Sequence, residues 1–381
     1  MRVRDHPRVA VVSHGYYPRI GGIERQRAAV TALLRRRGYD PAVVCRRDPG
    51  TVPFQLIGGV PVHRITVGRN RALGSLVFSV AALARVAWLR PDIIQAHQFL
   101  STSRVGLLGK RILRVPLIVI AHRSGPIGDV QLYGSRRSSR RRVRHLVARA
   151  DALVGVSEEI CNELRDLGVD PARIHLIRNG IDGERFRRRS GDERVAIRTS
   201  LGLPPSAVVV TYVGRLAPEK RVPDLVAAFT ALPSGLDAHL VIAGDGPERQ
   251  ALADHCAGRD NIHLLGSVDD VAPLLGASDV FVLCSVAEGL SNAVLEACAS
   301  ELAVVLTDVG AARDVVTDGQ EGVLVRPCDD GQLAAQLRRV VEDAGLRNRL
   351  GAAARDRVVR DFGLEDTVGA FVKLYDEVLG R

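Results

Sequence analysis

Residues 280–299 read VFVLCSVAEGLSNAVLEACA, and this stretch decides the fold of the second half of the chain. It opens with an apolar run, 280–284, of the kind that forms buried parallel strands. Ser291 or Asn292 is then placed to begin a helix, because short polar side chains are preferred at that position. The residues that follow are apolar on every face of the helix except at Glu296. The stretch therefore predicts a strand, a loop and a buried helix of an α/β fold.

Two acidic residues lie around the start of this helix. Glu288 is on the loop and Glu296 is one turn into the helix. Both are expected at the carboxyl end of the strand, where open α/β sheets bind ligands. An isolated buried carboxylate is costly, so Glu296 must be paired, hydrogen-bonded or in contact with a ligand. A local capping or pairing role for Glu296 is the simpler alternative.

Length and composition indicate a globular protein of two domains. At 381 residues the chain exceeds what one hydrophobic core usually supports. The six cysteines include no Cys-x-x-Cys pair, which argues against a zinc ribbon or a disulfide framework and favours a reducing cytoplasm. The polar N-terminus does not resemble a secretion signal. The least polar longer stretch, 72–89, is interpreted as a buried helix rather than a membrane span.

The charge is distributed unevenly along the chain. Residues 1–185 contain 32 lysines and arginines against 14 acidic residues, a net charge of +18. The remaining residues contain 21 against 29, a net charge of −8. One half is therefore strongly basic and the other mildly acidic, which predicts different roles for the two halves.

Strand-length apolar runs alternate with helical patterns along the first half. They lie at 8–13, 41–45, 60–65, 92–96, 116–121 and 152–156. Such alternation predicts right-handed βαβ units and a parallel sheet. Histidines stand at the ends of two of these strands, at His97 and His122, and this edge of a parallel sheet faces ligands. For either histidine alone, a structural role is the simpler interpretation.

A glycine pair, Gly21 and Gly22, follows the first strand and precedes a helix predicted from about residue 23. A backbone without side chains lets a ligand approach the N-terminus of that helix, which attracts anions. The pair lacks the three-glycine spacing of dinucleotide-binding loops, so a simple turn is an equal alternative. On the helix, Arg25 and Arg27 are predicted to face water.

Residues 135–149 contain seven arginines and no acidic residue. Apolar residues at 143, 146, 147 and 150 recur at helical spacing, which predicts an amphipathic helix with a basic face. The simpler interpretation is a helix that packs on the core and keeps its arginines in water. The alternative is a surface from Arg136 to Arg149 that docks on an anionic membrane or a phosphorylated acceptor. Nucleic acid is disfavoured, because aromatic residues make up only 4% of the chain.

A polar, arginine-rich segment, 183–199, links the first half to a second α/β series that begins at residue 208. Its first strand is followed by Gly214, and Arg215 and Lys220 lie on the loop before the next helix. Two cations beside a helix N-terminus favour a diphosphate through both charge and dipole. Further strands are predicted at 238–243, 261–265, 303–307 and 322–325, and helices at 331–342, 346–360 and 364–379.

Five motifs in this order resemble the retaining GT-B glycosyltransferases of family 4. They are Gly21-Gly-Ile-Glu-Arg25, Ile177-Arg-Asn-Gly-Ile-Asp182, Val213-Gly-Arg-Leu-Ala-Pro-Glu-Lys220, Ala243-Gly-Asp-Gly-Pro247, and Glu288-Gly-Leu-Ser-Asn292 with Glu296. The resemblance covers nearly the whole chain. It implies an α/β, GT-B fold: two Rossmann-like domains with parallel sheets that face each other across a cleft. Residues 1–185 would bind the acceptor, residues 200–360 would bind the nucleotide-sugar, and the final helix, 364–379, would pack back on the first domain.

Matched position by position, the resemblance implies roles for named residues. Arg215 and Lys220 would contact the diphosphate of the donor. Glu288 would contact the hydroxyls of the donor sugar and Glu296 those of the ribose. The catalytic set would be His122, Glu288, Arg215 and Lys220. The glycine loop and the start of the helix would supply the other donor contacts, from Gly21, Gly22, Gly289, Leu290, Ser291 and Asn292.

The resemblance also implies the chemistry. A hexose-type sugar would move from a UDP- or GDP-sugar to an acceptor with retention of configuration. Two fixed cations and a helix N-terminus stabilise a departing diphosphate without a metal. The sequence contains no Asp-x-Asp triplet, the metal-binding signature of the other large transferase fold, so no metal or other cofactor is expected. The chain departs from the family at 300–303, where Ser-Glu-Leu-Ala replaces the common Ala-Gly-x-Pro turn.

Other functions stay open beside this one. A GT-B phosphorylase is disfavoured, because only Lys220 and Lys373 could hold pyridoxal phosphate in the second half and Lys220 is assigned to the donor. A GT-B epimerase and a catalytically silent nucleotide-sugar-binding subunit are the alternatives. The silent subunit predicts broken catalytic positions, and none is broken. The expected location is the cytoplasm, with peripheral attachment to the cytoplasmic membrane face through the basic helix as the variant.

Overall fold

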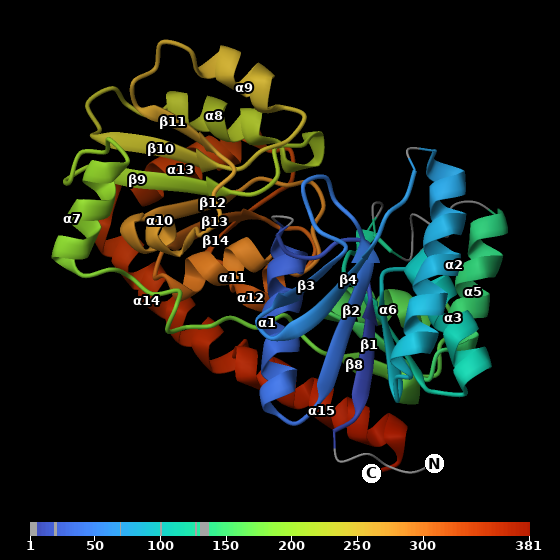
Figure 1. The fold of residues 1–381 in the computed structure, drawn as a ribbon. Helices are drawn as coiled ribbons and strands as arrows, with labels where there is room; N and C mark the ends of the chain where they lie inside the picture. Colours follow the sequence, from blue (N-terminus) through green and yellow to red (C-terminus); the bar gives the residue numbers. More distant parts are fainter. Residues whose placement is uncertain (1–5, 19–20, 69, 100, 126–127, 130–136) are drawn as a thin grey trace. The chain divides into compact units, whose positions relative to one another are not determined.

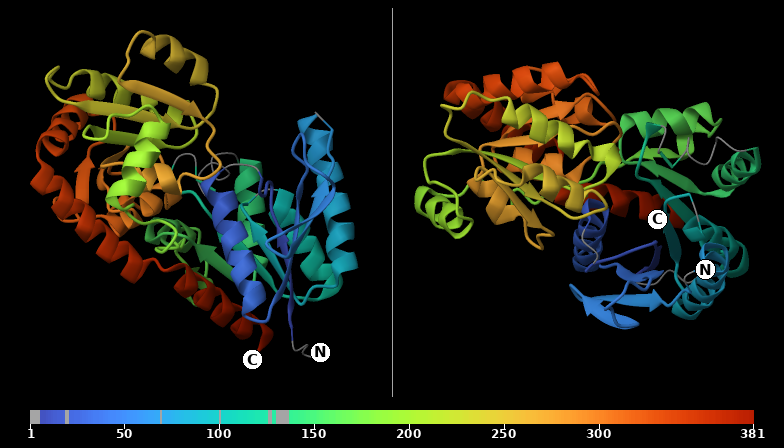
Figure 2. Two further views of the ribbon diagram at one scale, coloured as in Figure 1. Left: turned by 60° about the vertical axis from the view of Figure 1, so that its left-hand side comes forward. Right: turned by 90° about the horizontal axis from the view of Figure 1, so that it is seen from above.

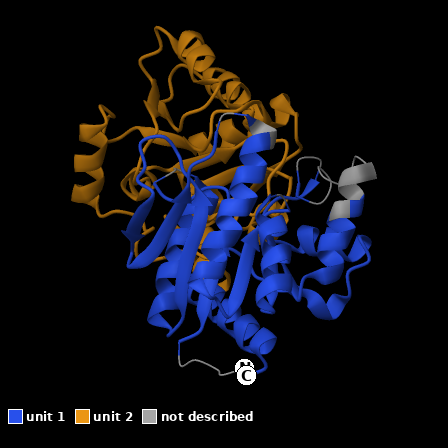
Figure 3. Ribbon diagram, turned by 45° about the vertical axis from the view of Figure 1, so that its right-hand side comes forward, with its two compact units in different colours: residues 1–179, 364–381 blue, residues 180–363 orange. Residues whose placement is uncertain are grey.

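The computed structural model describes residues 6–18, 21–68, 70–99, 101–125, 128–129 and 137–381. The chain forms two compact units (Figure 3). Unit 1 comprises Met1–Asn179 together with Leu364–Arg381, and unit 2 comprises Gly180–Gly363. Among the described residues, no helix is long and apolar enough to cross a bilayer.

Unit 1 contains an eight-stranded sheet of order β3-β4-β2-β1-β5-β6-β7-β8. Its strands are β1 (Arg8–Val12), β2 (Asp40–Arg46), β3 (Phe54–Ile57), β4 (Val60–Ile65), β5 (Ile93–His97), β6 (Leu117–Ala121), β7 (Ala152–Gly155) and β8 (Ile174–Leu176). The pairing is parallel except between β3 and β4. The six predicted strands are confirmed. The short edge strands β3 and β8 were missed, because neither is a buried apolar run.

The helices of unit 1 cover both faces of this sheet (Figures 1 and 2). They are α1 (Gly22–Arg36), α2 (Arg71–Leu89), α3 (Ser101–Leu113), α5 (Arg137–Arg149), α6 (Glu158–Asp166) and α15 (Leu364–Leu379). The final helix α15 packs against α1, whereas α2 packs against α3 and α3 against α5. The apolar stripe predicted for α5 is confirmed, since Val143, Leu146, Val147 and Ala150 are all buried.

The prediction that residues 72–89 form a buried helix is wrong for one face of α2. Phe78, Ala82 and Val86 are buried against the unit, but the opposite face exposes apolar side chains, among them Val80 and Trp88. Hydropathy alone led to the error, because a helix that is apolar all round usually lies in a core. This exposed face therefore needs another explanation.

Unit 2 contains a six-stranded parallel sheet of order β11-β10-β9-β12-β13-β14. Its strands are β9 (Val208–Val213), β10 (Ala238–Ala243), β11 (Ile262–Gly266), β12 (Val280–Leu283), β13 (Ala303–Thr307) and β14 (Gly322–Val325). Its helices are α7 (Gly191–Ser200), α8 (Val222–Thr230), α9 (Arg249–Cys256), α10 (Ala272–Ala277), α11 (Asn292–Ala299), α12 (Ala312–Val315), α13 (Asp330–Glu342) and α14 (Ala344–Asp361). All six strands were predicted.

Each sheet has a topological switch point, where consecutive strands are added on opposite sides. In unit 1 the switch lies between β1 and β5, and in unit 2 between β9 and β12. Open α/β sheets bind ligands at the carboxyl ends of the strands at such points. The two switch points are therefore where functional side chains are expected.

Candidate active-site residues in the two units

Three loops meet at the switch point of unit 2. The loop after β9 forms a short 3-10 helix, Pro218–Lys220, and its Glu219 carbonyl accepts a hydrogen bond of 2.9 Å from the backbone N–H of Val286, after β12. The hydroxyl of Thr307, at the end of β13, donates to the Ser285 carbonyl at 2.6 Å. Because the three strands are neighbours in the sheet, their loops form one continuous surface.

Lys220 and Glu288 form an ion pair on this surface. The hydroxyl of Ser285 also donates to the same oxygen of Glu288, at 2.7 Å. The side chains of Lys220 and Glu288 are only 19% and 13% exposed, so water screens the pair weakly. The resemblance implies separate contacts of the two residues with the donor, and the structure also joins them to each other. The pair fixes the ammonium group of Lys220 at the switch point.

The N-terminus of α11 lies beside a small pocket lined by Glu288, Gly289, Leu290 and Ser291, together with apolar side chains such as Leu283, Val294 and Leu306. Ser291 precedes the helix as predicted, but its side chain makes no capping hydrogen bond. The side-chain oxygen of Asn292 is buried and has no hydrogen-bond partner among the described residues. Glu296 is 7% exposed. The start of the helix thus has backbone N–H groups without intrahelical partners near the pocket, and a buried acceptor that no described residue uses.

Arg215 is the second cation predicted for this edge. Its side chain is exposed and makes no hydrogen bond or ion pair within the part of the chain that the structure describes. The loop that carries it is nevertheless held firmly. The Arg215 carbonyl accepts a hydrogen bond from the Tyr212 hydroxyl at 3.0 Å, and the Leu216 N–H donates to the Asp245 carbonyl at 2.9 Å. Arg215 is thus an exposed cation on a held loop, and no described residue supplies an anion to it.

The Gly-Asp-Gly-Pro motif explains how the Arg215 loop is held. A Cβ on Gly244 would lie 1.8 Å from the Gly214 carbonyl oxygen, and one on Gly246 would lie 2.1 Å from that of Leu216. Such distances are impossible, so glycine is required where the loops after β9 and β10 cross. These glycines support the site and leave no room for side chains at the crossing.

In unit 1 the glycine pair lies at the start of α1. Gly21 precedes the helix with extended backbone, and a Cβ at this position would lie 2.3 Å from a carboxylate oxygen of Glu24. Gly21 therefore allows the Glu24 side chain to fold back over the first turn. This carboxylate lies where the helix N-terminus attracts negative charge.

Arg27, on the second turn of α1, was predicted to face water, and this is wrong. It is 6% exposed, and its Nη1 donates to the Gly15 carbonyl at 2.6 Å. Its Nε has no hydrogen-bond partner, and Arg27 forms no ion pair among the described residues. Periodicity placed it on the polar face, but an arginine reaches inward when a loop carbonyl needs a donor. The result is a buried cation that forms no direct ion pair with the described residues, although the Glu24 carboxylate lies near enough to act on its charge.

A chain of hydrogen bonds connects α15 to His122 through β5. The Tyr375 hydroxyl contacts Oε1 of Gln95, and Nε2 of Gln95 lies 2.9 Å from Nε2 of His97. Nδ1 of His97 lies 2.8 Å from Nε2 of His122, and the two rings stack at a centroid distance of 5.1 Å. The histidines that the sequence left as alternatives therefore act together. Gln95 was missed, although its spacing of two from His97 places both on one face of the strand.

The donor and acceptor groups fix the direction of this chain. Tyr375 is fully buried, and the Gln95 oxygen is the only acceptor for its hydroxyl among the described residues. The Gln95 amide nitrogen must then donate to Nε2 of His97, so a neutral His97 carries its proton on Nδ1. His97 donates in turn to Nε2 of His122. A neutral His122 therefore carries its proton on Nδ1 and presents it as a donor.

Comparison with known proteins identifies the chain. The sequence model described as Glycosyl transferases group 1 matches residues 193–357, and the one described as Glycosyltransferase Family 4 matches residues 20–185. A D-inositol 3-phosphate glycosyltransferase of Geodermatophilus obscurus is 32% identical, with 88% of this chain and 82% of that protein covered. The chain belongs to the family 4 glycosyltransferases.

Other relatives of this family 4 glycosyltransferase span most of its length. An N-acetyl-alpha-D-glucosaminyl L-malate synthase of Bacillus anthracis is 26% identical over 95% of this chain and 96% of its own. A GDP-mannose-dependent alpha-mannosyltransferase of Mycobacterium tuberculosis is 30% identical over 84% and 83%. The crystal structure of Anabaena HepE in complex with UDP-glucose has a TM-score of 0.82 at 20% identity, covering 98% of this chain and all of that chain. The GT-B fold is thereby confirmed, and the enzyme uses a nucleotide-sugar.

The histidine pair of this glycosyltransferase is held neutral. Burial lowers the pKa of His122 to about 3, and the Arg27 and Arg123 guanidiniums act in the same direction. Burial also lowers the pKa of His97 well below its usual value, with Arg27 and His122 contributing. Unfolded histidine titrates near 6.5. The free energy of unfolding should therefore fall as the pH drops below about 6.5, because only the unfolded chain takes up these protons.

Nitrogen-15 NMR of the histidine rings should show His97 and His122 neutral from pH 7 to pH 5, each with its proton on Nδ1. Replacing Tyr375 with phenylalanine removes the hydroxyl that fixes the Gln95 amide, so both rings should become mixtures of tautomers. Tyr39→Phe is the matched control, because the Tyr39 ring packs against Tyr375 but its hydroxyl donates to Asp376 instead. A proton on Nε2 of His122 in the unaltered enzyme would contradict the derived direction.

Proposed function

We propose that this glycosyltransferase transfers a hexose-type sugar from a UDP- or GDP-sugar to an anionic acceptor, with retention of configuration and without a metal ion. The part of the proposal that concerns the sugar donor is supported by the Lys220–Glu288 ion pair beside the pocket at the α11 N-terminus. Among the solved structures with this fold, HepE was crystallised with UDP-glucose. One of the relatives is named for GDP-mannose, so both nucleotides stay in the proposal.

The charges at the unit 2 switch point fit a diphosphate. The ammonium group of Lys220 has three N–H donors, and its bond to Glu288 leaves two for phosphate oxygens. Arg215 adds a guanidinium that no protein group occupies among the described residues. The N-terminus of α11 adds backbone N–H groups beside Leu290 and Ser291. Together these groups would hold the donor and neutralise the diphosphate as the glycosidic bond breaks.

Retention follows in this proposal from the leaving group itself. As the bond between the sugar and the diphosphate breaks, the departing phosphate oxygen takes the proton of the acceptor hydroxyl. The acceptor oxygen then bonds to the sugar on the face that the phosphate leaves. Glu288 and Glu296 would orient the sugar and ribose hydroxyls, and His122 would offer its Nδ1 proton to a ligand oxygen.

The anionic acceptor is supported by unit 1. Arg27 is a buried cation without an ion pair in the described part of the chain, and it lies after Gly21–Gly22 at the switch point. Two relatives are named for anionic acceptors, D-inositol 3-phosphate and L-malate. A buried charge without a direct ion pair is costly, and a ligand anion would offset part of that cost beyond what Glu24 supplies. Cytoplasmic membrane attachment through the arginines from Arg136 to Arg149 belongs to the same proposal, although Arg136 lies outside the described residues.

Thermal unfolding in the presence of UDP-glucose, UDP-N-acetylglucosamine, GDP-mannose and ADP-glucose tests the donor. At a concentration about 100 times its Kd, the true donor should raise the melting temperature by on the order of 5 °C or more. The shift should persist in excess EDTA if no metal ion is required. Incubation of that donor with inositol phosphate or malate, followed by proton NMR, would reveal the product and its anomeric configuration. Absence of a shift with every donor, binding without turnover, or inversion would each contradict the proposal.

A further inference from the structure

The exposed face of α2 is a continuous apolar stripe. Leu73, Leu76, Val77, Val80 and Trp88 are 59%, 56%, 40%, 64% and 67% exposed. Their spacing of three, four, seven and fifteen residues places them on one side of the helix, opposite its buried face. Single exposed apolar residues are ordinary, but a stripe along a whole helix is not.

Neighbouring elements extend this stripe. Leu108 and Ile112 of α3, the helix that packs against α2, are 41% and 60% exposed. At the other end, the Trp88 ring packs edge-on against His63 at 5.9 Å, and His63 contacts the exposed Phe54 ring of β3 at 5.1 Å. We call the exposed apolar residues of α2 and α3, together with Phe54, the α2 face. Helices α2, α3 and α5 lie side by side in Figure 1.

The part of the chain that carries the α2 face is strongly basic, although Lys110 of α3 is paired with Asp151, just after α5. Residues 49–150 contain 17 lysines and arginines and only two acidic residues, Asp92 and Asp129. Asp129 is buried and accepts a hydrogen bond from the His122 backbone, and Asp92 is half-buried and accepts one from the Arg8 backbone. The exposed arginines of α3 and α5 include Arg104, Arg111, Arg141 and Arg144, and Arg114 directly follows α3. An apolar surface with cations beside it is complementary to a partner that has an apolar interior and an anionic surface layer.

A second copy of this chain fits that description poorly. A twofold interface on the α2 face would bring two sets of arginines together with few acidic residues to oppose them, and like charges that meet across an interface repel each other strongly. A bilayer with anionic headgroups supplies the required partner. The stripe from residue 73 to residue 88 is about 22 Å long. A stripe of this length along one side of a helix suits a helix that lies parallel to the membrane surface.

We propose that the α2 face inserts into the surface of an anionic bilayer, with Val80 and Trp88 among the acyl chains and the arginines of α3 and α5 at the headgroups. The guanidinium of Arg85 lies over the Trp88 ring at 5.0 Å, so this cation stays beside the ring at the interface. The electrostatic attachment proposed above involves the same membrane but uses the arginines of α5. The α2 face would add a hydrophobic anchor, and salt does not screen hydrophobic contacts.

Trp88 is the only tryptophan of the chain, so its fluorescence reports directly on this helix. Adding vesicles of phosphatidylcholine and phosphatidylglycerol to the full-length enzyme should shift its emission to shorter wavelength and protect it from acrylamide. Vesicles of phosphatidylcholine alone should bind more weakly, because the attraction of the arginines is lost. Val80→Asp should reduce partitioning about tenfold or more, by removing a buried apolar group and adding a charge.

The matched control is Val195→Asp on α7 of unit 2, since Val195 is also about half exposed, at 45%, but lies outside the α2 face. It should leave partitioning unchanged. Arg141→Gln with Arg144→Gln should weaken binding while the bound fraction keeps its shifted emission, which separates the insertion from the electrostatic attachment. Vesicle binding with Trp88 still exposed to acrylamide would overturn the insertion. If the Trp88 emission shifted without vesicles, and the shift grew with protein concentration, the membrane insertion would be overturned and a second copy of the chain would cover the α2 face instead.

Discussion

Replacing Lys220 with methionine should lower the turnover of the sugar donor about 10²-fold or more, while the enzyme stays folded. Loss of one preorganised donor to a developing anion typically costs this much, because the group acts in a partly buried site at no cost of reorganisation. Lys220 is 19% exposed and is already held by Glu288, so its ammonium group does not have to be ordered when the donor binds. The rate of nucleoside diphosphate release measures the effect.

The ion pair adds a second contribution to this loss. In Lys220→Met the carboxylate of Glu288 would remain partly buried, hydrogen-bonded to the Ser285 hydroxyl but without the Lys220 charge, next to the place proposed for the diphosphate. Donor affinity should therefore fall together with turnover. In the double variant Lys220→Met with Glu288→Gln, this repulsion is removed, so affinity should recover in part while turnover stays low. The non-additivity of the two changes measures their coupling.

Lys373→Met is the matched control, because Lys373 is an exposed lysine on α15 of unit 1. Its turnover should equal that of the unaltered enzyme. Lys220→Arg should be intermediate, since the charge is kept but the planar guanidinium donates in a different geometry. A turnover within about threefold of normal in Lys220→Met would remove Lys220 from the proposed catalytic set, because a lost donor of this kind costs far more.

The sequence predicted the sheets well because buried strands leave a strong local signal. Runs such as Val208–Val213 and Val280–Leu283 are mostly apolar and rich in β-branched residues, and they are bounded by loop residues, so sequence patterns detect them. The placement of Lys220 and Glu288 at one edge followed from the same reasoning, since both come directly after strands. The direct contact between Lys220 and Glu288 could not be predicted in this way. It depends on which strands are neighbours in the sheet, and the order of the strands is a long-range property.

Side chains that depart from the periodic pattern were the ones that could not be predicted. Arg27 falls on the polar side of α1 by spacing, yet it turns inward to the Gly15 carbonyl. Tyr375 lies 280 residues from its partner Gln95, so no local pattern connects them. The apolar stripe of α2 resembled core residues, because hydropathy does not distinguish a buried face from one kept for a partner. Functional sites are where such conflicts concentrate.

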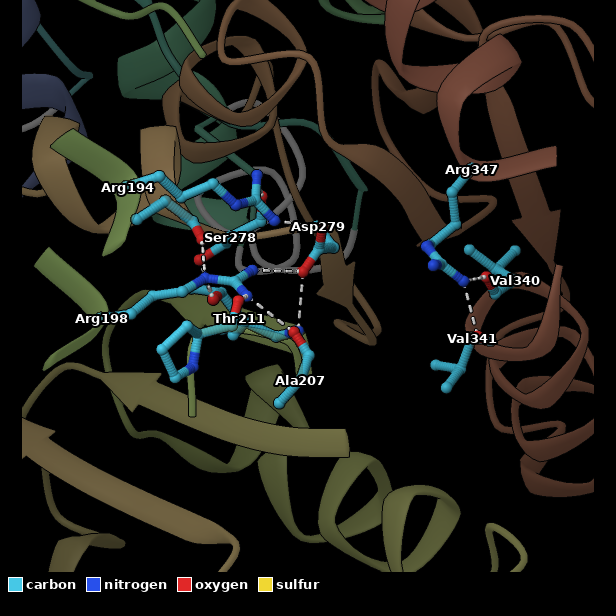
Figure 4. A network of polar contacts seen from close by, with 12 residues as sticks. Arg194, Arg198, Ala207, Thr211, Ser278, Asp279, Val340, Val341 and Arg347 are labelled. Carbon is cyan, nitrogen blue, oxygen red and sulfur yellow. Dashed lines mark hydrogen bonds and ion pairs between the residues drawn. The ribbon is translucent and has the colours of Figure 1, made fainter. Parts of the chain in front are cut away.

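The stability of unit 2 should depend on a buried ion network rather than on its many surface ion pairs. Arg198 of α7 is 2% exposed, and its guanidinium forms a 2.6 Å ion pair with Asp279 before β12 (Figure 4). It also donates to the carbonyls of Ala277 and Ala207 at 2.9 and 2.8 Å. Asp279 accepts a further hydrogen bond from the Val209 backbone at 2.9 Å, and this ties α7 to the starts of both central strands.

Replacing Arg198 with methionine should destabilise unit 2 by about 3 kcal/mol or more, the usual cost of breaking a buried pair by removing one partner. The carbonyls to which Arg198 donates lose this donor, and among the described residues Asp279 keeps Arg194 as its one ion-pair partner. Arg338→Met on α13 is the control, because the Arg338–Glu342 pair is exposed and screened by water. Urea unfolding followed by circular dichroism measures the difference.

The single tryptophan makes this prediction specific to one unit. Trp88 lies in unit 1, so its fluorescence follows the unfolding of that unit, whereas circular dichroism follows both. In Arg198→Met the circular dichroism transition should move to lower urea and separate from the Trp88 transition, because the change acts on unit 2 alone. Coincident transitions would mean that the units unfold as one. An unchanged circular dichroism midpoint would show instead that the Arg198–Asp279 network is dispensable for the stability of unit 2.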